Sequence, residues 1–330
     1  MTKGNLRHIL LCGGAGYVGS HMAKWLAERG FTVTVLDNLS TGHSAAAQWG
    51  ELLKVDLLDS AGVEEVFRSR RFHSVMHFSA RSLVGESVTN PYSYYANNVS
   101  GTLNLLQAMQ RHNVKRLVFS STAAVYGQPM SPLINEDHPK SPINPYGMSK
   151  LMVEHMLADA ATAYGLKSVS LRYFNAAGAT ATGEIGEAHQ PETHLIPNVL
   201  RAVLGQGPGL KVFGGDYETP DGTCLRDYVH VEDLAQAHEL ALGYMDANEG
   251  AHAFNLGSGR GFSVREVIAT SEQVSGRRVP YEIVERRPGD PATLIASSER
   301  AKRDLHWQPK FTELTSIVES AWRWHLNPKF

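Results

Sequence analysis

The 330-residue chain has the composition of an ordinary soluble globular protein, with 42% hydrophobic and 19% charged residues. Its formal net charge is −2, so no excess of positive charge would attract nucleic acid or anionic lipid. No apolar run approaches the ~20 residues that span a bilayer. The two cysteines, Cys12 and Cys224, form no C-x-x-C pattern, which is typical of reduced thiols. We therefore expect a cytoplasmic protein whose partners include neither nucleic acid nor a membrane.

The first half of the chain alternates short apolar runs with helical stretches. The expected strands lie at residues 8–12, 32–37, 52–56, 74–78, 116–120 and 167–173. The expected helices lie at residues 17–29, 61–70, 90–112 and 146–164. Strands that are apolar along their whole length and separated by helices indicate a parallel sheet covered on both faces. The predicted fold is α/β, with a doubly wound, Rossmann-like parallel sheet.

This alternation ends near residue 176, where a stretch rich in Gly, Pro and Thr begins. We expect an NAD-binding domain at 1–176 and a smaller substrate domain at 177–330. The runs at 228–231 and 253–257, with a helix between them, indicate that the chain returns to the main sheet near 228–258. The two domains are therefore expected to be interleaved.

Three glycines, Gly13, Gly16 and Gly19, form G-x-x-G-x-x-G between the first strand and the first helix. Such a turn lets a pyrophosphate approach the backbone at the positive end of the helix. Asp37 ends the second strand, where a carboxylate binds the adenosine ribose hydroxyls and repels a 2′-phosphate. The pattern predicts NAD rather than NADP, with Asp56 as a candidate adenine contact.

Tyr146 and Lys150 begin a predicted helix with i, i+4 spacing, which places both side chains on one face. A free tyrosine has a pKa near 10, so a neighbouring cation is needed to make it a base at neutral pH. Hydroxyls at Ser120, Ser121 and Thr122 lie where the fifth strand ends, at the ligand-binding edge of such sheets. This combination indicates proton transfer beside a nicotinamide ring.

Other catalytic classes find no support in the sequence. His238-Glu239-Leu240-Ala241-Leu242 lacks the second histidine of a zinc helix, and no other Cys/His cluster has ligand spacing, so we expect no metal. A Ser-His-Asp hydrolase is disfavoured because the chain has no G-x-S-x-G elbow.

Longer motifs make the chain similar to the UDP-glucose 4-epimerases, a group of the extended short-chain dehydrogenase/reductase family. The motifs are GGAGYVGSH at 13–21, LDNLSTGH at 36–43, YYANNVSGT at 94–102, SSTAAVYG at 120–127, NPYGMSKLMVE at 144–154, RYFNAAGA at 172–179, PETHLIP at 191–197, DGTCLRDYVHVEDLA at 221–235 and RRPGDPA at 286–292. The resemblance covers nearly the whole chain.

The resemblance implies a role for each matching position. Tyr146, Lys150 and Thr122 would be catalytic, with Thr122 and Tyr146 also contacting the sugar. The residues implied around NAD, besides the three glycines, Tyr146 and Lys150, are Tyr17, Val18, Asp37, Asn38, Asp56, Leu57, Phe78, Ser79, Asn97 and Tyr173. The residues implied to hold a UDP-sugar are Asn175, Leu195, Arg226, Arg287, Asp290 and Leu294.

The implied activity is NAD-dependent epimerisation of UDP-glucose and UDP-galactose at C4 through a transient 4-keto sugar, by a homodimer. A 4,6-dehydratase would need an Asp-Glu pair after Thr122, where this chain has Ala123-Ala124. A 4-epimerase for UDP-N-acetylglucosamine or a UDP-pentose is the main alternative, because Leu294 would close the sugar pocket less than a tyrosine does. A catalytically inactive NAD-sensing regulator is a remote alternative.

Overall fold

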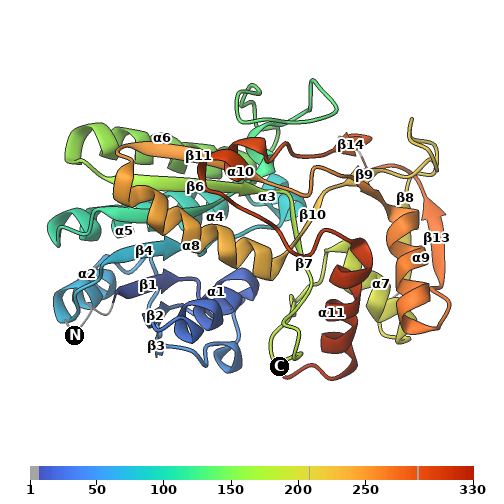
Figure 1. The fold of residues 1–330 in the computed structure, drawn as a ribbon, viewed down its shortest axis with the longest axis horizontal. Helices are drawn as coiled ribbons and strands as arrows, with labels where there is room; N and C mark the ends of the chain where they lie inside the picture. Colours follow the sequence, from blue (N-terminus) through green and yellow to red (C-terminus); the bar gives the residue numbers. More distant parts are fainter. Residues whose placement is uncertain (1–6, 208, 288–289) are drawn as a thin grey trace.

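A computed structural model describes residues 7–330 except 208 and 288–289. Its centre is a seven-stranded parallel sheet with the order β11-β6-β5-β4-β1-β2-β3 (Figure 1). The strands are β1 (His8–Cys12), β2 (Thr32–Leu36), β3 (Glu51–Leu53), β4 (Ser74–His77), β5 (Arg116–Thr122), β6 (Lys167–Tyr173) and β11 (Ala251–Leu256). The predicted doubly wound α/β fold is confirmed.

Both faces of the sheet are buried because its strands are apolar on both sides. In β1, Ile9 and Leu11 belong to one core cluster, while Leu10 and Cys12 belong to the other. This division follows from the alternation of side chains along a strand. Helices α1 (Tyr17–Glu28) and α8 (Val231–Ala247) cover the first face; α2 (Ser60–Ser69), α5 (Gly101–Arg111) and α6 (Pro145–Tyr164) cover the second (Figure 1).

The helix expected over residues 90–112 is divided. It consists of α4 (Pro91–Tyr94), a π-helical segment at Tyr95–Ser100 and then α5, and the short helix α3 (Val84–Thr89) precedes it. π-helical turns occur mostly as local bulges, frequently at functional sites. Here the bulge contains Asn97 and Asn98, and Asn98 is buried. Periodicity alone predicted the helix but not this interruption.

A separate core lies beyond the carboxyl end of the sheet, around α7 (Leu195–Val203), α9 (Val264–Ser275) and α11 (Leu314–Leu326) (Figure 1). Short strands accompany it: β8 (Leu210–Phe213) with β13 (Tyr281–Val284), and β9 (Leu225–Arg226) between β12 (Phe262–Ser263) and β14 (Thr293–Leu294). A short helix, α10 (Glu299–Asp304), packs near β11.

The chain crosses between the two parts more than once. β10 (Tyr228–His230) pairs with β7 (Asn175–Ala177) in a two-stranded sheet of its own, so this run does not join the main sheet as expected. The following α8 covers the main sheet, and β11 pairs with β6 at its edge. The predicted domain boundary at 176 falls inside β7 and stays a prediction. Among the described residues, no helix is long and apolar enough to cross a membrane.

Candidate active site

The glycine turn joins β1 to α1, and two of its positions exclude any side chain. A Cβ on Gly13, whose φ is +79°, would lie 2.5 Å from the backbone nitrogen of Ser79. A Cβ on Gly19 would lie 2.1 Å from the carbonyl oxygen of Gly13. Gly16 precedes α1 and provides no side-chain cap, so the first-turn N–H groups suit a pyrophosphate. The turn therefore fits a dinucleotide.

The residues expected to surround the adenosine meet at the ends of β2 and β3. The buried carboxylate of Asp37 accepts hydrogen bonds from the backbone N–H of Ala15 at 3.0 Å and of Leu39 at 2.9 Å. Burial raises the pKa of the Asp37 carboxyl, and these two hydrogen bonds oppose the shift. Asn38 donates its side-chain N–H to Asp56 over 2.8 Å. Leu57, in contrast, is buried in the core.

Other expected cofactor contacts lie along the same edge of the sheet. The backbone N–H groups of Phe78 and Ser79 both donate to the carbonyl of Cys12, which holds the end of β4 against β1. Asn97 donates to the side chain of the buried Asn98 over 2.9 Å. The hydroxyl of Tyr17 donates to the carbonyl of Gly178 over 2.6 Å. Val18, beside Tyr17, is half-buried.

Helix α6 brings Tyr146 to the end of β5. Asn144 caps the helix by accepting the N–H of Gly147 at 2.9 Å. A Cβ on Gly147 would lie 2.4 Å from the carbonyl oxygen of Ala124, so the helix starts directly against the turn that follows β5. The side chains of Tyr146 and Thr122 lie near each other there. Burial raises the pKa of Tyr146, and the nearby Thr122 hydroxyl opposes this rise.

Lys150 lies one helical turn after Tyr146 and is only 2% exposed. Its ammonium donates to the carbonyl oxygen of Ser120 over 2.7 Å and lies 4.7 Å from the ring centre of Phe119. Burial lowers the pKa of Lys150 to about 7, although the carboxylate of Glu154 favours its charged form. The side chain is thus fixed beneath the end of β5.

Ser120 and Tyr173 complete this group of polar side chains. Their hydroxyls are hydrogen-bonded to each other, and burial raises the pKa of Tyr173. Because β5 and β6 are parallel neighbours, their carboxyl ends place Thr122 beside Tyr173 in register. Hydroxyls from two strands and one helix therefore gather at a single edge of the sheet.

Sequence reasoning missed a buried polar network beneath these residues. Glu154 of α6 accepts two hydrogen bonds from Arg172 of β6, at 2.9 and 2.5 Å, and one from Ser121 of β5 at 2.6 Å. Arg172 also donates to the hydroxyl of Tyr126 over 2.9 Å. An ion pair with this many hydrogen bonds fixes the helix against both strands. The RYFN motif contained Arg172, but nothing in the sequence indicated its partners.

Three of the expected substrate residues converge outside the sheet. Asp290 lies between two guanidinium groups, 3.7 Å from Arg226 and 3.1 Å from Arg287. Arg226 also donates to the carbonyl of Pro291 over 2.9 Å. Pro288 and Gly289 of the same motif lie outside the described residues. This convergence provides a positively charged site that could hold a diphosphate.

The remaining expected substrate residues lie around this group. Asn175 donates its side-chain N–H to the carbonyl of Asp227 over 2.8 Å. Leu195 begins α7 and packs on its core. Leu294 of β14 pairs with Arg226 of β9 and packs against the cluster that contains Val125, Tyr126, Ile134 and Leu151.

The buried carboxylate of Asp227 was another missed residue. It accepts hydrogen bonds from the backbone N–H groups of Ser258 at 2.7 Å, Ala296 at 3.0 Å and Gly259 at 3.3 Å, and from the Ser258 hydroxyl. Burial raises the pKa of Asp227 to about 6, although these hydrogen bonds favour the charged carboxylate and so lower the pKa. The residue joins three segments that are distant in sequence.

Comparisons with known proteins agree with this geometry. The NAD dependent epimerase/dehydratase family matches residues 9–257. UDP-glucose 4-epimerase of Halalkalibacterium halodurans is 52% identical over 317 residues, which cover 96% of this chain and 95% of that protein. UDP-glucose 4-epimerase of Bifidobacterium longum, solved with NAD+ and UDP, has a TM-score of 0.92 and 37% identity over 97% of this chain and 98% of that chain.

The name of a third relative includes a second sugar. The UDP-Glc/GlcNAc 4-epimerase of Campylobacter jejuni has a TM-score of 0.85 and 41% identity over 97% of this chain and 99% of that chain. The chain therefore belongs to the NAD dependent epimerase/dehydratase family and, within it, to the UDP-glucose 4-epimerases.

Proposed function

We propose that Tyr146, Thr122 and Lys150 carry the NAD-dependent interconversion of UDP-glucose and UDP-galactose at C4. The proposal rests on the neighbouring side chains of Tyr146 and Thr122 at the end of β5, with the buried Lys150 one helical turn after Tyr146. Two hydroxyls there can hold the 4-oxygen of the sugar, and one of them can take its proton. Bound NAD supplies the hydride acceptor and, on the return, the hydride donor.

The first half-reaction oxidises the sugar. The Tyr146 phenolate takes the proton of the 4-hydroxyl while the C4–H electron pair leaves as hydride, which produces a C4=O bond. Thr122 hydrogen-bonds the same oxygen. Since burial raises the pKa of Tyr146, its phenolate depends on nearby positive charge, which Lys150 and the oxidised nicotinamide provide.

The second half-reaction returns the hydride to the opposite face of the sugar. The 4-keto sugar turns within the site, and Tyr146 gives the proton back to O4. The UDP portion must stay bound during this turn, and Arg226 and Arg287 are placed to hold its diphosphate. Such a diphosphate would compete with Asp290 for both guanidinium groups.

Leu294 determines which sugars are accepted. Its side chain lies beside Arg226 in register and packs near the turn that follows Thr122. A leucine leaves more room beside the sugar C2 than a tyrosine would, so UDP-N-acetylglucosamine is the second candidate substrate. Relatives support both alternatives: the Campylobacter jejuni enzyme is named for GlcNAc as well as Glc, and the Stenotrophomonas maltophila enzyme was solved with formylated UDP-arabinopyranose.

The functional unit is a homodimer in the cytoplasm. Helices α4, α5 and α6 expose large apolar side chains, among them Tyr92 (84% exposed), Leu103, Met148 and Met152. An apolar surface on neighbouring helices suits a four-helix interface about a two-fold axis. The two cysteines are free and buried, which accords with a reducing compartment.

The decisive test is the variant Tyr146→Phe, assayed with UDP-galactose. Loss of the general base should lower kcat by about 10²-fold or more, with NAD binding retained. Tyr164→Phe removes an exposed hydroxyl from the other end of the same helix and should keep wild-type activity. Retention of more than about a tenth of the activity in Tyr146→Phe would rule out this residue as the base.

A further inference from the structure

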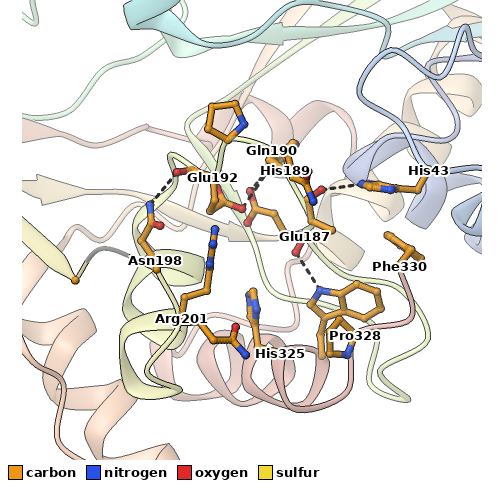
Figure 2. A pocket seen from close by; sticks show the side chains of 16 residues that line it. His43, Glu187, His189, Gln190, Glu192, Asn198, Arg201, His325, Pro328 and Phe330 are labelled. Carbon is orange, nitrogen blue, oxygen red and sulfur yellow. Dashed lines mark hydrogen bonds and ion pairs between the residues drawn. The ribbon is translucent and has the colours of Figure 1, made fainter.

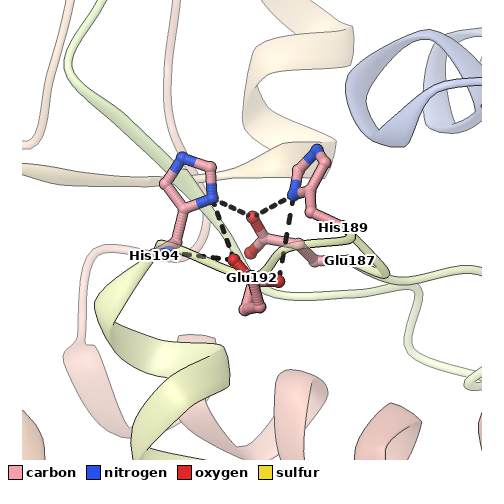
Figure 3. A group of neighbouring side chains, drawn as sticks. All are labelled: Glu187, His189, Glu192 and His194. Atoms are coloured by element: carbon pink, nitrogen blue, oxygen red, sulfur yellow. Dashed lines mark hydrogen bonds and ion pairs between the residues drawn. The ribbon is translucent and has the colours of Figure 1, made fainter. Parts of the chain in front are cut away.

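Four side chains outside the proposed active site form a compact group between β7 and α7. Glu187, His189, Glu192 and His194 each direct one ligand atom inward, and these four atoms lie within 4.8 Å of one another (Figure 3). The segment is irregular, so none of the helical or C-x-x-C ligand spacings predicts it. The proposed epimerisation uses none of these four side chains.

The separations within the group lie on either side of the ligand-to-ligand distance in a metal coordination sphere. The Nδ1 atom of His194 lies 2.6 Å from Glu187 and 3.3 Å from Glu192, and the Nδ1 atom of His189 lies 3.0 and 3.9 Å from the same two residues. Zinc binds His nitrogen and carboxylate oxygen at about 2.0–2.2 Å, which places neighbouring ligands of a tetrahedron roughly 3.4 Å apart. The 2.6 Å contact between His194 and Glu187 would have to lengthen for an ion to enter.

One contact in the group does not have the geometry of a hydrogen bond. The buried Nδ1 atom of His194 has no aligned hydrogen-bond partner, although a carboxylate oxygen of Glu187 lies 2.6 Å away. The ring nitrogen and the carboxylate oxygen therefore form a close ion pair without the alignment of a hydrogen bond. Figure 3 shows both imidazoles directing their inner nitrogen toward the two carboxylates.

Burial adds a second reason for a cation at this point. The side chain of Glu187 is 5% exposed and that of Glu192 is 3% exposed. Two buried carboxylates require compensating positive charge. Within the described ranges, the ion pairs to these carboxylates come from His189 and His194 alone. The neighbouring Glu187 carboxylate raises the pKa of His194 to about 10, so a protonated imidazole supplies part of this charge in the absence of an ion.

The surroundings hold the ligands in place and leave a path to them. Glu192 accepts the backbone N–H groups of Thr193 at 2.8 Å and His194 at 2.9 Å. The indole N–H of Trp324 donates to the carbonyl of Glu187 over 3.0 Å. Outer hydrogen bonds of this kind orient metal ligands. A cavity of about 500 Å³ adjoins the group, which gives an ion access from solvent (Figure 2).

We propose that Glu187, His189, Glu192 and His194 bind a divalent transition-metal ion, with zinc as the best match. Two imidazoles and two carboxylates favour zinc over magnesium or calcium, which prefer oxygen ligands alone. The ion is structural, because four protein ligands leave no position for a substrate. This site is independent of the proposed chemistry at Tyr146.

The ion fixes the segment that enters α7. Leu195, an expected substrate contact, directly follows the ligand His194. On the other side, the His189 ring packs edge-on against Tyr17 of α1, with ring centres 6.2 Å apart. Metal loss should therefore loosen both contacts, raising the KM for UDP-sugar more than it lowers kcat.

The test uses the full chain without an affinity tag, stripped by a chelator and then titrated with Zn²⁺ while binding is measured by calorimetry. We expect one ion per chain, a higher melting temperature and, with Co²⁺, the intense visible absorption of tetrahedral coordination. The double variant His189→Ala, His194→Ala should bind zinc at least about 100-fold more weakly. His155→Ala, at an exposed position of α6, should bind as the wild type does.

Two results would overturn the site. One is zinc binding by the double variant with unchanged affinity; the other is failure of the wild-type chain to bind a stoichiometric ion. If the double variant does not fold, the Co²⁺ spectrum of the wild-type protein decides: a weak octahedral spectrum, or none, contradicts the proposed four-ligand site.

Discussion

Lys150 is a cation buried where little compensates its charge. Burial lowers its pKa to about 7 from an ordinary value of 10.5. Between these two values the unfolded chain binds more protons than the folded chain, so the stability of the cofactor-free protein rises with pH across this window. Below pH 7 the lysine is charged in both states, and its burial is fully unfavourable.

The variant Lys150→Met tests this effect in the cofactor-free protein. It should be more stable than the wild type at pH 6, by on the order of 1.4 kcal/mol for each unit of the pKa shift, and the difference should shrink by pH 9.5. Urea unfolding at the two pH values measures it. An equal difference at both values would show that Lys150 keeps its ordinary pKa when buried.

Leu294 tests sugar selection at a single position. Leu294→Tyr adds bulk to a packed site, which typically costs about 1–3 kcal/mol, or roughly 5- to 150-fold in binding. Turnover of UDP-N-acetylglucosamine should fall by that factor while turnover of UDP-glucose stays near wild type. Leu294→Met, of similar volume, serves as the control. Equal losses on both substrates would show that Leu294 does not select between them.

At the scale of elements, the start of α6 against the turn after β5 positions Tyr146 beside Thr122, two of the proposed catalytic residues. Gly147→Ala places a Cβ 2.4 Å from the carbonyl oxygen of Ala124, so the helix must move. Displacement by about 1 Å can cost up to about 10²-fold in rate. We expect kcat to fall while NAD binding persists, as shown by steady-state kinetics and a binding titration.

Gly85→Ala is the matched control for this displacement. Gly85 lies in α3, and a Cβ there meets no atom within 4 Å. This variant should keep wild-type kcat. Wild-type kcat in Gly147→Ala would mean that the contact between α6 and the turn does not position Tyr146.

The accuracy of sequence prediction also differs between elements. β6 has the predicted bounds, Lys167–Tyr173, because Val169, Leu171 and Tyr173 alternate with polar residues, which is the period of a strand. β9, β12 and β14 have only two residues each, too few to show any periodicity. Their positions depend on contacts between distant segments, which one sequence does not reveal.

The same limit applies to the site. The glycine turn and the pair Tyr146 and Lys150 are local motifs, so spacing alone could predict them. The bond from Asp227 to Ala296 joins residues 69 positions apart, and the pair of Glu154 with Arg172 joins two different elements. A carboxylate's buried partner cannot be inferred from its neighbours in the chain.

At the scale of the whole molecule, the apolar surface of α4, α5 and α6 predicts the assembly. Light scattering should give about twice the chain mass of 36.2 kDa. The double variant Leu103→Glu, Met152→Glu places charges on exposed apolar positions of α5 and α6 and should yield single chains. Leu326→Glu, at an exposed leucine at the end of α11, should remain dimeric. A wild-type mass of one chain would contradict the interface.

In the proposed reaction, hydride leaves C4 of the sugar and returns to the same carbon. The most direct test is to incubate the enzyme with UDP-glucose that carries deuterium at C4 and to analyse the UDP-galactose by NMR. We expect the product to retain deuterium at C4. We also expect that the label is not lost to NAD added to the solution. Replacement of the label by hydrogen from water would contradict the account, because it would show proton abstraction at C4 instead of hydride transfer.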